Sequence, residues 1–102
     1  MAQQVEHRFP ADHPAAAGHF PGQPVIPAAL LLDEVRRAVA EIGGLTPRGF
    51  LAVKFLHPVR PGDELLIRWE DVRGAVRFEC RLSDPERLAV SGLLTWADEP
   101  PR

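Results

Sequence analysis

The stretch from Pro27 to Gly44 reads PAALLLDEVRRAVAEIGG and predicts the one strong helix of this sequence. Proline suits the first helical position, and the pair Gly43–Gly44 is a stop signal. At 100° per residue, the apolar side chains of Leu31, Val35, Ala38, Val39 and Ile42 fall on one stripe. Because such a stripe needs an apolar partner surface, we expect the helix, residues 27–42, to pack on a sheet.

The hydrophobic period changes from helical spacing to alternation after the glycine pair. Four segments carry this strand pattern, at residues 50–57, 64–72, 76–82 and 88–96, and residues 3–9 are a further short strand candidate. The turns that join the four segments are short, so their neighbours should be antiparallel. We therefore predict an α+β domain in which one helix covers a mainly antiparallel sheet.

Length and composition exclude several classes of protein. The chain has 102 residues, 45% of them apolar and 25% charged, which is typical of one soluble globular domain. A net charge of -2 gives no basic field for nucleic acid. No apolar run approaches the ~18 residues of a membrane span. We assign residues 1–97 to a single domain and residues 98–102 to a frayed tail.

The titratable side chains argue against a metal or disulfide framework. Cys80 is the single cysteine, which excludes an internal disulfide and a multi-cysteine zinc site and fits a reducing cytoplasm. We expect it to be a buried small hydrophobe. No pair of histidines has metal-ligand spacing beside a carboxylate, so we predict no metal; His7 and His57 are read as structural or exposed.

Residues 10–27 are irregular and hold five prolines and two glycines. Such segments usually build a site. The order Gly18-His19-Phe20-Pro21-Gly22, then Pro24, Pro27 and Asp33, resembles the active-site segment of the hot-dog-fold 3-hydroxyacyl-acyl carrier protein dehydratases. A second match, Pro58-Val59-Arg60-Pro61-Gly62-Asp63, shares the same register. Within that family the sequence is most similar to short stand-alone members associated with aryl polyene pathways.

This resemblance implies a fold, a site and partners. The fold would be a hot dog, with one central helix wrapped by the sheet, in a homodimer or higher homo-oligomer. His19 would be the catalytic base and Asp33 the acid, supplied by the two different subunits. Substrate-binding positions would be Phe20, Gly22, Pro27 and Ala28, with the N–H groups of Ala28 and Gly22 as donors to the thioester oxygen. Acyl carrier protein would be the partner, and phosphopantetheine or coenzyme A would carry the substrate without a further cofactor.

The chemistry of dehydration independently explains these residue types. A base must remove the C2 proton, and histidine has a suitable pKa near neutrality. An acid must protonate the departing hydroxyl, and a carboxyl beside a dry tunnel can retain its proton. Backbone N–H groups at a helix start can stabilise the charge that develops on the thioester oxygen. Glu34 is the rival acid, about 100° around the helix from Asp33.

Two departures from the family pattern affect this hypothesis. Ala28 replaces a glycine, so a methyl group stands where the thioester should pass. Arg37 replaces a glutamine one turn after Asp33, and we expect this (i, i+4) neighbour to lower the pKa of the Asp33 carboxyl. We also expect strained backbone at residues 19–22. Basic residues that form either a rim for an acidic carrier or an ordinary mixed surface are Arg36, Arg37, Arg48, Lys54, Arg60 and Arg68.

Three alternatives to a dehydratase remain open at this point. A hot-dog acyl thioesterase would need a carboxylate that activates water or attacks the carbonyl. A non-catalytic dehydratase-like subunit is favoured by Ala28 and Arg37. An (R)-specific enoyl-CoA hydratase fits less well, because the Asp-x-Asn-Pro-x-His pattern is absent and Asp12-His13-Pro14 supplies only fragments of it.

Overall fold

The computed structural model describes residues 2–12, 25–44, 46–83 and 85–96. The elements are β1 (Gln3–Arg8), α1 (Ala28–Glu41), β2 (Pro47–Phe55), β3 (Glu64–Val72), β4 (Ala75–Leu82) and β5 (Arg87–Trp96). The predicted helix and strands are thus confirmed, with shifts of one to three residues at most ends. Among the described residues, no helix is long and apolar enough to cross a membrane.

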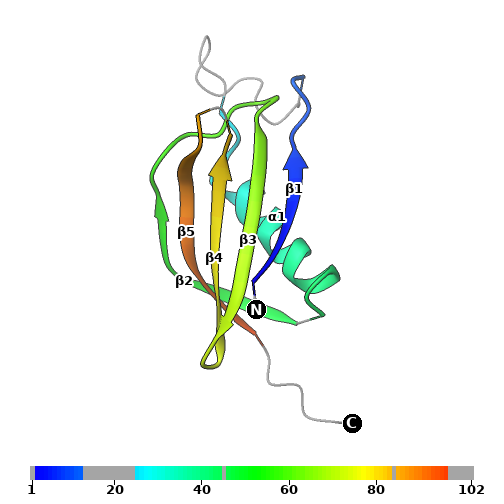
Figure 1. Cartoon of the computed structure of the whole chain (residues 1–102), viewed down its shortest axis with the longest axis vertical. Coiled ribbons are helices and arrows are strands. Elements are labelled where there is room, and N and C mark those ends of the chain that lie inside the picture. Colours follow the sequence, from blue (N-terminus) through cyan, green and yellow to red (C-terminus); the bar gives the residue numbers. More distant parts are fainter. Residues whose placement is uncertain (1, 13–24, 45, 84, 97–102) are drawn as a thin grey trace.

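The five strands form one antiparallel sheet in the order β1-β3-β4-β5-β2. The helix follows β1 and precedes β2, which are the two edge strands, so the chain must cross the whole sheet between them. Figure 1 shows α1 lying across one face of the sheet, which is the path that this connection requires. The edge strand β2 follows α1 directly in the chain, so the helix and this edge of the sheet come from one continuous segment.

The core lies between α1 and the sheet. Leu31, Val35 and Val39 of α1 are buried. They face the buried sheet residues Leu65, Ile67, Trp69, Val76, Phe78, Cys80, Leu82, Val90 and Leu94. Ile42, which the sequence placed on the apolar stripe, is instead 52% exposed. Ile42 is the C-cap of α1 and borders the open cleft between α1 and the strands β1 and β3, together with Val5 and Ile67.

Two register shifts change the course of strands in the sheet near the pocket described below. β5 has a register shift opposite Cys80 and Arg81, and there the consecutive residues Ala89 and Val90 are both fully buried. β2 has a shift between Leu51 and Lys54 that contains Ala52, a non-glycine residue with φ of 53°. Bulges of this kind bend a strand and redirect its side chains. The shift in β2 lies just before the end of this strand, where apolar side chains are exposed.

Candidate active site

An apolar pocket of about 370 Å³ lies at the start of α1. It is lined by Val25, Ile26, Ala28, Leu31, Phe55, Leu56, His57, Pro58 and Val59. The Ile26 N–H donates to the Val59 carbonyl at 2.7 Å, and the Leu56 N–H donates to the Ala89 carbonyl at 2.7 Å. These bonds join the approach to α1, the turn after β2 and the bulged part of β5 into one frame.

The helix start supplies backbone donors to this pocket. Pro27 is the N-cap and makes no side-chain cap, and the first turn holds no acidic residue. The Pro27 carbonyl accepts from Leu30 and Leu31 at 3.0 and 3.2 Å. Helix geometry leaves the N–H groups of Ala28 and Ala29 without an acceptor inside the helix, at its positive end. An oxygen that gains negative charge in this pocket would be stabilised there.

Several predicted site residues cannot be placed. His19, Phe20 and Gly22, with the strain expected at residues 19–22, lie outside the described residues. Pro27 and Ala28 are described, and the methyl group of Ala28 is exposed at the pocket. The structure therefore shows the helix-start half of the predicted site.

Asp33 is half-exposed on α1, and its neighbour differs from the prediction. Arg36, not Arg37, donates to Oδ1 of Asp33, from Nε at 3.1 Å and from Nη2 at 2.5 Å. Arg37 instead contacts Glu34 at 3.5 Å and Glu41 at 4.0 Å. The expected Asp33–Arg37 contact is thus wrong, because two other carboxylates hold the guanidinium of Arg37. Asp33 is not among the described residues that line the pocket of its own chain.

Glu34, the rival acid, faces a different cleft. Its carboxylate lies 3.3 Å from Nδ1 of His7 on β1 and also contacts Arg37. His7 packs edge-on against Phe9, with ring centroids 4.6 Å apart. The cleft of about 120 Å³ around these groups lies between β1 and α1, and the helix start does not line it. This cluster therefore ties the edge strand to the helix, which favours a structural role for Glu34.

His57 is a pocket residue that the sequence analysis placed as merely structural or exposed. It is half-buried and lines the pocket beside Ala28 and Leu31. Its ring contacts Arg87, which is 30 positions later in the chain. Alternation along one strand does not reveal a contact of that range. One sequence feature could have indicated this position: His57 directly precedes the Pro58-Val59 turn, which resembles the family pattern.

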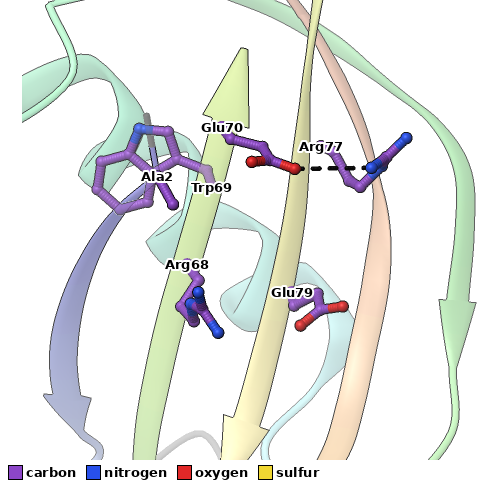
Figure 2. Close-up of a pocket in the computed structure, with 6 residues that line it drawn as sticks. All are labelled: Ala2, Arg68, Trp69, Glu70, Arg77 and Glu79. Carbon is purple, nitrogen blue, oxygen red and sulfur yellow. Dashed lines mark ion pairs between the residues drawn. The ribbon is translucent and has the colours of Figure 1, made fainter. Parts of the chain in front are cut away.

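The six basic residues do not form one continuous rim. Arg36 and Arg37 are paired with helix carboxylates. Arg48 stands near the start of β2, Lys54 lies near its end, and Arg60 lies in the turn beyond that end. Figure 2 shows Arg68 with Glu70, Arg77 and Glu79 on the sheet face turned away from α1, where Glu70 and Arg77 pair at 3.6 Å. This hollow of about 210 Å³ has mixed charge, which favours an ordinary surface.

Cys80 is not a nucleophile of this site. It is fully buried on the core face of β4, as predicted. Burial, and secondarily the carboxylate of Glu79, raises the pKa of its thiol to about 12. The reactive thiolate is therefore scarce near neutral pH. Within the described residues, no three metal-ligating side chains form a cluster.

The fold defines the broad class of this protein. One helix on a five-stranded antiparallel sheet of this order is a hot-dog fold. A solved chain of the dehydratase heterocomplex ApeI:P from Xenorhabdus doucetiae aligns with a TM-score of 0.79 at 22% identity, over 94% of this chain and 87% of that one. An acyl-CoA hydrolase from Staphylococcus aureus aligns with a TM-score of 0.68 at 17% identity, over 94% and 62%. At these identities the likeness shows the fold alone.

Sequence comparison identifies the family. The family model described as "ApeI-like: ApeI dehydratase" matches residues 2–92. A 3-hydroxyacyl-[acyl-carrier-protein] dehydratase FabZ from Albidiferax ferrireducens is 35% identical over 101 residues, covering 84% of this chain and 67% of that protein. The chain therefore belongs to the ApeI-like dehydratase family, and it spans about two thirds of this FabZ relative. The predicted resemblance is confirmed.

Proposed function

We propose that this protein dehydrates a 3-hydroxyacyl thioester, carried on the phosphopantetheine of an acyl carrier protein, to the trans-2-enoyl thioester. The observation that carries the proposal is the apolar pocket of about 370 Å³ at the uncapped start of α1. Its walls suit an acyl chain, and the Ala28 N–H suits a thioester oxygen. The name of the FabZ relative describes this reaction.

In the proposed mechanism, His19 removes the C2 proton while the N–H groups of Ala28 and Gly22 stabilise the thioester oxygen. The C3–O bond then breaks, the C2–H electron pair becomes the new double bond, and Asp33 gives a proton to the departing hydroxyl. Water leaves, and His19 and Asp33 exchange protons with solvent to restore the site. Phe20 and Pro27 border the substrate. Because only protons and water move, the thioester carrier is the only accessory group required.

We also propose that the active form is a homodimer joined through β2. Asp33 is not among the described residues that line the pocket of its own chain, and a second copy would bring an acid to it. β2 is an edge strand of nine residues. Leu51, Phe55 and Leu56 are 50–55% exposed on or just after it. A long edge with apolar side chains pairs readily with another strand. Each subunit would be the single domain of residues 1–97.

The double variant Leu51→Glu/Leu56→Glu should weaken this dimer by more than tenfold in Kd. Each leucine contributes about 1.5–3 kcal/mol when buried, and a charge in its place must be desolvated. Light scattering across a concentration series measures the effect. Ile42→Glu is the matched control, because Ile42 is equally exposed but lies at the helix end. A wild-type monomer at micromolar concentration would refute the dimer.

The function is tested by product analysis with 3-hydroxyacyl thioesters of acyl carrier protein and of coenzyme A. Mass spectrometry should show loss of one water with the thioester intact. Release of free thiol would instead indicate a thioesterase, an activity that the same fold hosts in the hydrolase above. Carrier binding without any conversion would indicate a non-catalytic subunit.

The methyl group of Ala28 should restrict the pocket. Ala28→Gly keeps the N–H group and removes the methyl, so we expect kcat/KM for a 3-hydroxyacyl thioester to rise by about three- to tenfold. The control is Ala29→Gly, since Ala29 is exposed in the same turn but is not among the described lining residues. An equal effect of both variants would mean that altered helix stability, and not pocket width, is responsible.

A further inference from the structure

Among the described residues that line the pocket at the start of α1, His57 has the one polar side chain and the others are apolar. Both ring nitrogens of His57 are engaged. Nδ1 lies 3.0 Å from the Pro58 carbonyl oxygen, and Nε2 lies 3.1 Å from Nε of Arg87. The imidazole is therefore held at both of its polar atoms.

These two contacts determine the protonation of the ring. A carbonyl oxygen only accepts hydrogen bonds, so Nδ1 must carry a proton. The arginine Nε–H only donates, so Nε2 must be the acceptor and carries none. While both bonds persist, the ring is held as the Nδ1–H tautomer.

Arg87 reaches this ring from the covered face of the sheet. It begins β5 and pairs in register with Leu82, which is buried in the core. Cross-strand partners share a face, so Arg87 leaves the sheet on the side of α1. Its Nη1 donates to the Pro85 carbonyl at 2.6 Å, and no described carboxylate lies within ion-pair distance of it. Arg81, on the opposite face, pairs instead with Glu79 and Glu86.

Resting on the proposed function, we propose that Arg87 is a positioning residue of the thioester site. By donating to Nε2, it holds the ring of His57 in one tautomer and one orientation, so the pocket wall does not present a second free base to the substrate. The structural reason is that a free imidazole here would share an apolar pocket with the acidic C2–H group of the thioester. Arg87 is the described charged side chain that contacts His57, and the described lining residues of α1 and of residues 25–27 are not titratable.

The test combines Arg87→Leu, His57→Phe and the double variant, with Arg81→Leu as the matched control. At about pH 8, ¹⁵N NMR should show His57 as the Nδ1–H tautomer in the wild type, whereas in Arg87→Leu the Nε2–H tautomer should gain population. KM for a 3-hydroxyacyl thioester should rise about tenfold in Arg87→Leu, with a smaller change in kcat. Arg81→Leu should change neither measurement.

The double variant separates positioning from general stability. In the His57→Phe background, Arg87→Leu should change KM by less than about twofold, because the residue through which Arg87 acts is gone. An equal cost of Arg87→Leu with and without His57 would overturn the proposal. Equal tautomer populations of His57 in the wild type and in Arg87→Leu would do the same. If the wild type converts no thioester, the proposed function fails, and the NMR comparison still decides whether Arg87 sets the state of His57.

Discussion

Replacing His19 by alanine should lower kcat/KM for 3-hydroxyacyl thioester dehydration by at least ~10²-fold, the usual contribution of a positioned general base. The C2 proton is only weakly acidic, so its removal needs a base already aimed at it. The histidine that the structure shows at the pocket, His57, has Nε2 occupied by Arg87, so we do not expect it to substitute. The measurement is the steady-state rate of enoyl thioester formation by ultraviolet absorbance.

A matched control variant distinguishes the loss of a catalytic group from a general loss of folding. His7→Ala removes a histidine that contacts Glu34 in the cleft between β1 and α1. It should therefore leave kcat/KM within a few-fold of wild type, even if the protein is less stable. Full dehydratase activity in His19→Ala would remove His19 from the mechanism and leave the family membership intact.

Mixing His19→Ala subunits with Asp33→Ala subunits should restore activity, although each variant alone should lose at least ~10²-fold. If sites form across the dimer, each heterodimer holds one site with both native groups and one with neither. Free exchange of equal amounts gives heterodimers in half of the molecules, so about a quarter of all sites become native. The expected rate is therefore about a quarter of wild type.

We expect the acid to come from the partner subunit, and the position of Asp33 supports this expectation. Asp33 is on α1 but does not line the described pocket of its own chain, and its Oδ1 is bound by Arg36. Its Oδ2 has no hydrogen bond to a described residue, so it is the oxygen available to a substrate. Glu34→Gln is the control for a nearby helix carboxylate and should retain activity. Verified heterodimers without any recovery would mean that each site is built within one chain.

Local patterns of the sequence predicted the elements and the family. Helical spacing between Leu31 and Val39 and alternation from Val76 to Leu82 report which face of each element is apolar, and the core confirms both. The string Gly18-His19-Phe20-Pro21-Gly22 carried the family resemblance because its residues are contiguous. Contiguity and periodicity are local properties, so they can be read without knowledge of the fold.

Only the tertiary structure decided which distant groups meet. Alternation does not order strands, so the edge positions of β1 and β2 came from the sheet itself. The contact between His57 and Arg87 joins the turn after β2 to the start of β5. The sequence by itself determined the apolar faces and the family motif, whereas folding determined these contacts, because side-chain partners across a sheet are set by register and packing.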